Sequence, residues 1–256
     1  MCLITFRYDS NSDYPFVLIA NRDESYQRAS EEIHRWEDMP TIIGGRDLEA
    51  GGTWLAMNDE GKLAAITNQP FTQHLVVEPT SRGALITDYL SSDLTPVAYA
   101  EHLRKQRFRY EGYQLLFGTL DNLYVYNNVS DSFIDLDQQL YSISNTQDDL
   151  SSYRQEKSER QLMELLTQTN DLNIDDLIQL FQDQEVNPNF KNYPRQLNIE
   201  YARAASSIFI QHDDVFGTVS TTAILMNRQG EVKMKEVKYD PKKLIKETVL
   251  DFKLTF

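Results

Sequence analysis

The single cysteine of the chain, Cys2, directly follows the initiator methionine and is the residue best suited to chemistry. Methionine aminopeptidase removes Met1 when the second residue is small, and cysteine is small. Removal would leave a thiol nucleophile and a free α-amine on one residue. The amine, with a pKa of about 7.7–8.0, could then act as a base for the thiol, whose ordinary pKa is about 8.5. On position alone, a small buried apolar residue in a strand is the commoner role of a free cysteine.

A polar tetrad, Asn21-Arg22-Asp23-Glu24, ends the second apolar segment of the chain. If the first two segments pair as a hairpin, the tetrad lies beside Cys2. Arg22 would then hold a thiolate or a substrate carboxylate, with Asn21 as a further ligand-binding group, and Asp23 could orient the α-amine as an ammonium. A solvated strand end with a surface ion pair is the alternative.

Two asparagines, Asn68 and Asn145, close apolar segments that read as strands. An amide at a strand end can donate to a developing oxyanion, a role that is worth roughly 2.7–4 kcal/mol for one donor. Asparagine more commonly ends a strand through an Asx turn. The glycine-rich segments 44–47 and 51–54 predict either a demanding turn with Trp54 in the core or a loop that contacts a ligand. The four histidines are scattered without metal-binding spacing, so no metal site is expected.

Alternating apolar residues and turn signals predict several hairpins, and apolar residues three and four apart predict helices. The expected strands are 2–8 with 15–21, 53–58 with 62–68, 113–120 with 123–128, then 140–145, 206–211, and 220–227 with 231–239. The expected helices lie within 80–107, with a break at 91–93, and over 153–167 and 174–184, with Asp171 and Asn173 as candidate N-caps.

Clusters of strands thus alternate with clusters of helices, without the strict strand–helix–strand rhythm of a parallel sheet. This order predicts an α+β fold, a four-layer αββα sandwich of two antiparallel sheets with helices on each outer side. The 256 residues suffice for a single domain over 1–256, since one core extends to about 250–300 residues.

The net charge of −14 argues against a nucleic acid or an anionic membrane surface as a partner. One cysteine excludes an internal disulfide framework, no apolar stretch approaches the roughly 20 residues of a membrane helix, and the first residues lack a basic signal-peptide region. A cytoplasmic protein with a small-molecule substrate or ligand and no membrane insertion is therefore expected. The oligomeric state stays open.

Several segments together resemble the NRDE protein family, whose eukaryotic members are the transport-and-Golgi-organisation 2 proteins. They are MCLITF, LIANRDE, IIGGRD, GGTWLAMN, GKLAAITN, SRGALITDYL, YSISN and SSIFI followed by FGT-x-STTAIL. The family is similar to N-terminal nucleophile hydrolases such as the bile-salt and penicillin V acylases, which implies the αββα sandwich. The resemblance implies Cys2 as nucleophile, Asp23 as holder of the α-amine, Asn68 as the asparagine after the second hairpin, and Asn145 as the oxyanion-hole asparagine.

Two positions depart from these patterns. Arg22 and Asp23 are adjacent, whereas the acylases place the corresponding residues three positions apart. The segment FGT is usually followed by arginine in the NRDE family, but Val219 occupies that position here. If a cation is needed for a negatively charged ligand group, Arg203 is a nearby candidate for ligand binding.

The resemblance implies two functions of different kinds. The first is a cysteine amidohydrolase that cleaves a linear amide bond of a small acylated substrate without a cofactor, provided that Met1 is removed. The second is a non-catalytic protein that binds or carries haem or an acyl group in the same cleft, because relatives are linked to haem mobilisation and to lipid or acyl-CoA metabolism. The chain lacks a CxxCH haem-attachment motif.

Overall fold

The computed structural model of the protein describes residues 2–70, 76, 79–145, 149–169, 171–190, 198–241 and 246–255. By its internal contacts the chain forms two compact units. The first unit comprises Met1–Gln27 and Gln138–Asp251, and the second unit comprises Arg28–Asp137 and Phe252–Phe256.

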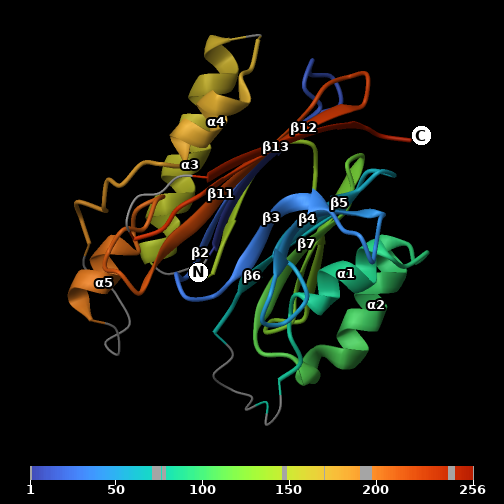
Figure 1. Cartoon of the computed structure of the whole chain (residues 1–256), viewed down its shortest axis with the longest axis horizontal. Coiled ribbons are helices and arrows are strands. Elements are labelled where there is room, and N and C mark those ends of the chain that lie inside the picture. The colour runs from blue at the N-terminus through green and yellow to red at the C-terminus, as the bar shows by residue number, and fades with distance from the viewer. Residues whose placement is uncertain are drawn as a thin grey trace. The chain divides into compact units, whose positions relative to one another are not determined.

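A six-stranded sheet organises the first unit, in the order β10-β1-β2-β11-β12-β13 (Figure 1). Its strands are β1 (Cys2–Tyr8), β2 (Phe16–Ser25), β10 (Leu140–Ser144), β11 (Phe216–Met226), β12 (Glu231–Lys238) and β13 (Lys246–Lys253). The strand β1 pairs antiparallel with β10 and β2, and β11 pairs antiparallel with β2 and β12. The long central pair β2–β11 therefore joins the beginning of the chain to its last third.

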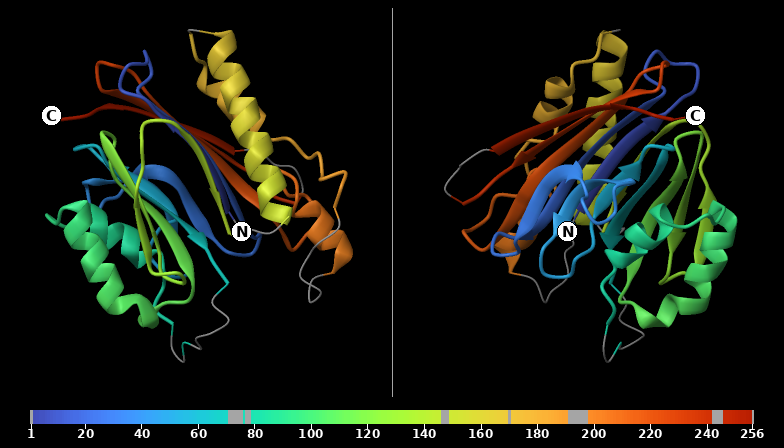
Figure 2. Two further views of the ribbon diagram at one scale, coloured as in Figure 1. Left: turned by 180° about the vertical axis from the view of Figure 1, so that it is seen from behind. Right: turned by 45° about the vertical axis from the view of Figure 1, so that its right-hand side comes forward.

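Two helices cover one face of this sheet, α3 (Asp149–Gln168) and α4 (Ile174–Leu180), as both views of Figure 2 show. A short helix, α5 (Ile199–Ala204), follows. The Asn173 side chain caps α4 by accepting from the Asp175 backbone N–H, as the sequence predicts. The core beneath the helices includes Leu3 and Ile19 from the sheet and Leu177 from α4. Odd-numbered residues at the start of β1 and β2 thus face the helices, and even-numbered ones face the opposite side.

The second unit holds a seven-stranded antiparallel sheet in simple sequence order, β3 to β9. Its strands are β3 (Ser30–Arg35), β4 (Ile42–Asp47), β5 (Leu55–Asn58), β6 (Lys62–Asn68), β7 (Tyr113–Thr119), β8 (Asn122–Asn127) and β9 (Ser132–Asp135). The helices α1 (Ala84–Leu90) and α2 (Pro96–Gln106) lie on one face, followed by a 3-10 turn, Arg107–Arg109.

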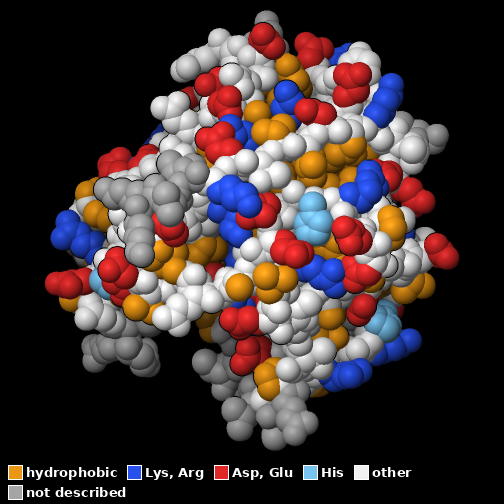
Figure 3. Space-filling view, viewed as in Figure 1, with side chains coloured by type: hydrophobic (Ala, Val, Ile, Leu, Met, Phe, Trp, Pro, Cys, Tyr) orange, Lys and Arg blue, Asp and Glu red, His pale blue; other side chains and the backbone are white. Residues whose placement is uncertain are grey.

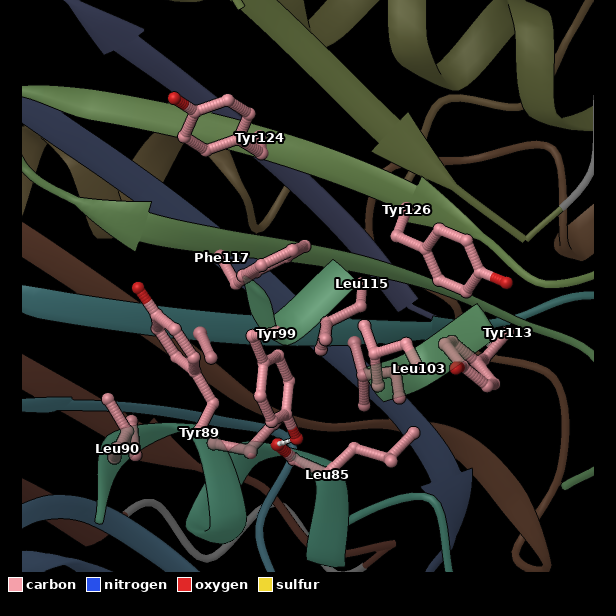
Figure 4. Close-up of a cluster of buried hydrophobic side chains, with 14 of the residues drawn as sticks. Leu85, Tyr89, Leu90, Tyr99, Leu103, Tyr113, Leu115, Phe117, Tyr124 and Tyr126 are labelled. Atoms are coloured by element: carbon pink, nitrogen blue, oxygen red, sulfur yellow. Dashed lines mark hydrogen bonds between the residues drawn. The ribbon is translucent and has the colours of Figure 1, made fainter. Parts of the chain in front are cut away.

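Aromatic side chains fill the core of the second unit (Figure 4). Tyr89 and Tyr99 project from the two helices towards Phe117 on β7, with ring centroids 5.2 and 5.8 Å from the Phe117 ring. The Tyr99 hydroxyl donates to the Leu85 carbonyl at 2.6 Å, which satisfies its buried oxygen.

The α+β class, the predicted hairpins and the helix break after residue 90 are confirmed. Gly61 and Gly230 adopt φ values of +80° and +72° in the turns that close two of the hairpins, where glycine carries no steric penalty. The sequence patterns missed β3, β4, β9, β13 and α5. The helix expected over 174–184 ends at Leu180.

Two local predictions were wrong. Residues 206–211 form turns and bends rather than a strand, apart from an isolated bridge from Gln211 to Gly217. Here side chains satisfy backbone groups that a ladder would otherwise pair, because the Ile208 carbonyl accepts from Asn21 Nδ2 and Arg154 Nη2.

The glycine-rich segment 44–47 is part of strand β4 and not a loop. A Cβ at Gly45 would lie 2.6 Å from the Trp54 ring, and one at Gly44 would lie 2.7 Å from the Ala56 Cβ. These glycines therefore allow close packing. Trp54 is only partly buried, whereas Trp36 is fully buried.

None of the described helices is long and apolar enough to cross a membrane. On the face shown in Figure 3, acidic side chains are scattered among basic ones instead of gathering in one patch.

Candidate functional site

The thiol of Cys2 lies on the face of the first unit's sheet that does not carry α3 and α4. Cys2 opens β1 and stands opposite Arg22 on β2, and Arg22 stands opposite Ser220 on β11. Residues directly opposite in an antiparallel pair project to the same face. Leu3, the next residue, belongs to the core under the helices. Cys2, Arg22 and Ser220 therefore share the helix-free face, and the Ser220 hydroxyl is buried without a hydrogen-bond partner among the described residues.

Asn21 points to the opposite face, beneath the helices. Its Nδ2 donates to the carbonyls of Phe181 and Ile208, each at 2.9 Å, and its Oδ1 accepts from Thr221 Oγ1 at 2.6 Å. The side chain is 1% exposed. Asn21 thus ties the central strands to the end of α4 and to the segment that precedes β11.

Asp23 also points beneath the helices and belongs to a buried ion pair. Arg154 on α3 donates from Nη2 to Asp23 Oδ2 at 2.9 Å, and the side chains are 2% and 0% exposed. Thr218 Oγ1 donates to Asp23 Oδ1 at 2.7 Å. Arg154 Nη2 donates as well to the Ile208 carbonyl at 3.0 Å. Two groups from different elements therefore hold the two carboxylate oxygens.

A β-bulge makes the contact between Thr218 and Asp23. Thr218 stands opposite Asp23 and Ser220 stands opposite Arg22, so Val219 is an extra residue in β11. With strict alternation, Ser220 and Thr218 would project to the same face. The bulge shifts the alternation by one residue and turns Thr218 towards Asp23 beneath the helices. Val219 is 8% exposed, and its carbonyl accepts from the Tyr239 N–H at 2.9 Å.

Asn145 holds the backbone nitrogen of Cys2. It directly follows β10, whose Ser144 stands opposite Leu3, and it is 7% exposed. Its Oδ1 accepts from the Cys2 backbone N–H at 2.7 Å. Since the side-chain oxygen is the acceptor, the NH₂ of the same amide is the part that can donate to another oxygen.

The surroundings of the thiol favour its protonated form. Burial is the main cause that raises the pKa of the Cys2 thiol, and the negative charge of Asp23 raises it further. The Asp23 backbone N–H and the Arg22 guanidinium act in the opposite direction. The thiol therefore needs a nearby base to become a nucleophile at neutral pH.

The chain is similar to one known protein family over most of its length. The model of the family described as Transport and Golgi organisation 2 matches residues 1–241. The chain belongs to the Transport and Golgi organisation 2 family. The human Transport and Golgi organization protein 2 homolog is 36% identical over 127 residues, which are 47% of this chain and 46% of the human protein. The matched part of this family member thus spans about half the length of the curated relatives.

Two solved structures share the fold of this family member. The Caenorhabditis elegans N-acylethanolamine-hydrolyzing acid amidase ortholog is 10% identical, with a TM-score of 0.50, over 89% of this chain and 93% of the amidase. A C2A mutant of the conjugated bile acid hydrolase from Clostridium perfringens is 8% identical, with a TM-score of 0.52, over 100% of this chain and 97% of the hydrolase. The predicted α+β class with two antiparallel sheets is confirmed, and the fold is like that of these two enzymes.

The structure brings together only part of the site that the sequence predicts for this family member. Cys2, Arg22 and Asn145 lie together at the start of β1, with Asp23 on the opposite face of the neighbouring strand. Asn68 ends β6 in the second unit, where it is half-buried and stands opposite Tyr113. Its role as an oxyanion donor stays a prediction.

Arg203 and the α-amine complete the set of predicted groups. Arg203 is exposed on α5 and lines a hollow with Asn187 and Phe190. None of its described contacts is with Cys2. Met1 lies outside the described residues, so the predicted contact between Asp23 and a free α-amine stays a prediction.

Arg154 and Thr218 are the two residues of this site that sequence patterns missed. A usable signal for Arg154 was its spacing, because Arg154, Ser158 and Leu162 lie four residues apart on one face of α3 and all are buried. An arginine in line with a buried leucine demands a partner. Thr218 carried no comparable signal, because its direction depends on the bulge.

A second hollow, of about 500 Å³, lies elsewhere in the first unit. It is lined by residues of the segments that precede β11 and follow β12, among them Phe209, Asp213 and Tyr239, and by Tyr26. Cys2, Arg22 and Asn145 do not line it. Within the described ranges, no three His, Cys, Asp or Glu side chains gather as a metal ion would require.

Proposed function

We propose that this protein is a cysteine N-terminal nucleophile amidohydrolase that cleaves a linear carbon–nitrogen (amide) bond of a small acylated substrate. The observation that supports it most is the hydrogen bond of 2.7 Å from the Cys2 nitrogen to Asn145 Oδ1, at a thiol that stands beside Arg22. The fold likeness agrees, because the two solved structures are described as an acid amidase and a conjugated bile acid hydrolase.

The proposed reaction uses both functional groups of an N-terminal Cys2. The α-amine takes the thiol proton while Sγ attacks the carbonyl carbon of the amide, and a C–S bond forms as the carbonyl oxygen becomes an oxyanion. The amine then gives that proton to the departing nitrogen, and the C–N bond breaks to leave a thioester. Water hydrolyses the thioester and returns the thiol. The raised pKa of the Cys2 thiol makes the base essential, because few thiols ionise unaided at neutral pH.

Two amides are assigned to the oxyanion. Asn145 would hold the α-nitrogen through Oδ1 and donate its NH₂ to the oxyanion, and Asn68 would supply a second donor. Arg22 would bind a carboxylate or another acidic group of the substrate, because it shares the face of the thiol. Asn21 instead supports the strand from below, and Arg203 is the candidate for a more distant ligand group. Catalysis would need no metal or cofactor, and we place the protein in the cytoplasm.

The mechanism requires a free amino group on Cys2, and this requirement gives a sharp test. The chain would be produced with a cleavable fusion partner, once so that cleavage leaves Cys2 as the first residue and once with a short extension left in front of it. Intact mass verifies each terminus. A panel of N-acyl amino acids and N-acylethanolamines is then assayed for release of the amine.

Hydrolysis is expected only from the protein that begins at Cys2, with a loss of at least 10³-fold in Cys2→Ser and in the extended form. Equal hydrolysis by the two forms, or hydrolysis that survives Cys2→Ala, would overturn the proposal. The alternative proposal, a carrier of haem or an acyl group, predicts tight binding of haem by both forms. A haem absorbance band that is unchanged in Cys2→Ser, together with no hydrolysis, would favour the carrier.

A further inference from the structure

We propose that Arg154 and Thr218 are positioning residues, which hold the Asp23 carboxylate beneath the sheet, neutralise it, and so control the reactivity of the Cys2 thiol on the other face. The consequence for catalysis rests on the function proposed above. The control of thiol reactivity does not, because it can be measured without any substrate.

The contacts form a continuous path from helix α3 to the nucleophile. Arg154 Nη2 donates to Asp23 Oδ2 at 2.9 Å, and Thr218 Oγ1 donates to Asp23 Oδ1 at 2.7 Å. Asp23 adjoins Arg22, which stands opposite Cys2 in the ladder. The backbone N–H of Asp23 also acts directly on the thiol and lowers its pKa.

The partners of Asp23 are themselves fixed from outside the strand. Arg154 Nη2 also donates to the Ile208 carbonyl, while Thr218 Oγ1 accepts from the Ile210 N–H at 2.8 Å. The Thr218 N–H in turn donates to the Ile210 carbonyl at 2.9 Å. The segment before β11 therefore holds both donors of the carboxylate. A shift of Asp23 would have to break several of these hydrogen bonds at once.

The sign of the effect follows from the charges. The negative charge of Asp23 opposes ionisation of the thiol, and Arg154 places a positive charge 2.9 Å from that carboxylate. Removing the guanidinium takes away the positive charge that lies 2.9 Å from the carboxylate and offsets its field at the thiol. The change favours the protonated thiol, because a like charge disfavours the charged form of a nearby acid.

A purely structural role of the ion pair makes a different prediction. A buried ion pair is weak evidence for stability, because apolar side chains of similar volume often replace it without loss. If the pair only fastened α3 to the sheet, its removal would lower the thermal midpoint and leave the ionisation of Cys2 in the folded protein unchanged. Thiol titration separates the two roles.

Cys2 is the only cysteine of the chain, so alkylation by iodoacetamide reports on this thiol alone. The rate would be measured from pH 6 to pH 10.5 on the full chain, with thermal denaturation as a check of folding. Arg154→Met should move the midpoint of the curve of alkylation rate against pH to higher pH. The rate at pH 8 should be about tenfold lower, which corresponds to one pKa unit. Arg154→Lys should largely restore the rate, because it keeps the charge.

Three further variants make the test specific. Arg160→Met removes an exposed arginine of the same helix and should leave the titration unchanged. The double variant Asp23→Asn/Arg154→Met should return the midpoint towards that of the natural protein. Thr218→Val removes one neutral donor and should give a shift in the same direction as Arg154→Met but smaller, about two- to threefold in rate.

The inference is overturned if folded Arg154→Met and Thr218→Val both titrate like the natural protein. If Arg154→Met does not fold, Arg154→Lys and Thr218→Val decide, and an unchanged midpoint in Thr218→Val counts against the proposal. The outcome is separable from that of the proposed amidase. A shift of the titration in a protein that hydrolyses no amide supports this inference and refutes the amidase. Hydrolysis with an unshifted titration supports the amidase and overturns this inference.

Discussion

The two units of this protein bury very different side chains beside their sheets. In the first unit, Asn21, Asp23 and Arg154 lie between the central strands and the helices. Asp23 and Arg154 form an ion pair, and Asn21 donates to two backbone carbonyls. In the second unit, the corresponding layer is a cluster of tyrosines and Phe117 with few polar contacts (Figure 4).

The difference shows what each unit contributes. Buried aromatic area stabilises the second unit without fixing any group for chemistry. A hydrogen-bonded polar layer costs desolvation, yet it fixes the direction of its side chains, because each hydrogen bond requires one geometry. The polar layer lies under the residues that flank Cys2. Its position indicates that the first unit gives up some apolar burial in exchange for a rigid site.

Two natural probes allow the comparison to be tested. Both tryptophans, Trp36 and Trp54, belong to the second unit, so their fluorescence reports on that unit alone. The only cysteine belongs to the first unit, so its alkylation reports on that one. Each variant below can therefore be followed separately in the two units.

The largest effect is expected in the aromatic core. Phe117→Ala removes a ring that contacts Tyr89, Tyr99 and Tyr124 and should lower the free energy of unfolding by about 3–5 kcal/mol. Denaturant unfolding followed by tryptophan fluorescence measures it. The exposed Phe108 is the matched control, since Phe108→Ala should change stability by only about 0.5 kcal/mol. Equal effects of the two variants would contradict the assignment of the core.

Breaking the polar layer should cost somewhat less and act on the other probe. Asn21→Leu removes the donor of the Phe181 carbonyl and leaves the Ile208 carbonyl with Arg154 Nη2 alone, and we expect the free energy of unfolding to fall by about 2–4 kcal/mol. Under native conditions Cys2 alkylation should accelerate, because the segments beneath β2 loosen. In the double variant Asn21→Leu/Thr221→Val, the loss of stability should be smaller than the sum of the two single losses. The reason is that Asn21→Leu alone already removes the amide that Thr221 Oγ1 contacts. Fully additive losses would show that the Asn21 and Thr221 side chains do not act together.

At the beginning of β11, Tyr26 and the Ile210 carbonyl lie so close to Gly217 that a larger side chain there would test the packing. A Cβ at Gly217 would lie 2.4 Å from Tyr26 Oη and 2.8 Å from the Ile210 carbonyl oxygen. Gly217→Ala should therefore destabilise the protein by about 1–3 kcal/mol. Adding Tyr26→Phe should recover part of that loss, because it removes the nearest atom. The thermal midpoint measures both, and a neutral Gly217→Ala would show that the strand can shift.

The smallest effect concerns pH. The Asp183 carboxylate accepts from Lys157 and Gln161, and although burial acts to raise the pKa of Asp183, these hydrogen bonds outweigh it and lower that pKa. The resulting stabilisation is present above the ordinary pKa of about 3.9 and is lost as the pH falls through the lowered value. We expect the free energy of unfolding to fall by about 1 kcal/mol below pH 4, and to fall by less in Lys157→Met.

The second unit should respond differently to pH. Burial raises the pKa of Tyr89, Tyr99 and Tyr113 well above the ordinary value, so these phenols stay neutral through mildly alkaline conditions. Tryptophan fluorescence should then be constant from pH 4 to pH 10. A transition within that range would indicate that the tyrosine cluster is more accessible than the structure shows.

Much of the architecture could be read from the sequence, because its signals are local. Alternation of period two, with turn signals such as Gly61 and Gly230, indicated four hairpins, and the resemblance of the chain indicated the fold class. The same signals placed Arg22 beside Cys2, which the register confirms. The short or polar strands β3, β9 and β13 escaped, because few apolar residues mark them.

The contacts that distinguish the two faces of the site could not be predicted from the local sequence. Asp23 and Arg22 are neighbours in sequence but project to opposite sides of the sheet, and the partners of Asp23 lie 131 and 195 residues away. Segment 206–211 looks like a strand because it is apolar. The Ile208 carbonyl instead accepts from side chains of β2 and α3, and only the folded chain shows this competition.

The β-bulge at Val219 affects the shape of β11 more than the pairing of Thr218 with Asp23. A substitution there leaves the count of residues unchanged, so Thr218 still meets Asp23. Deletion of the single codon would make Thr218 and Ser220 consecutive, as their partners Asp23 and Arg22 are, so a regular ladder would keep Thr218 opposite Asp23. The strand would lose the local bend and the added twist that a bulge gives, while its two faces would present the same side chains.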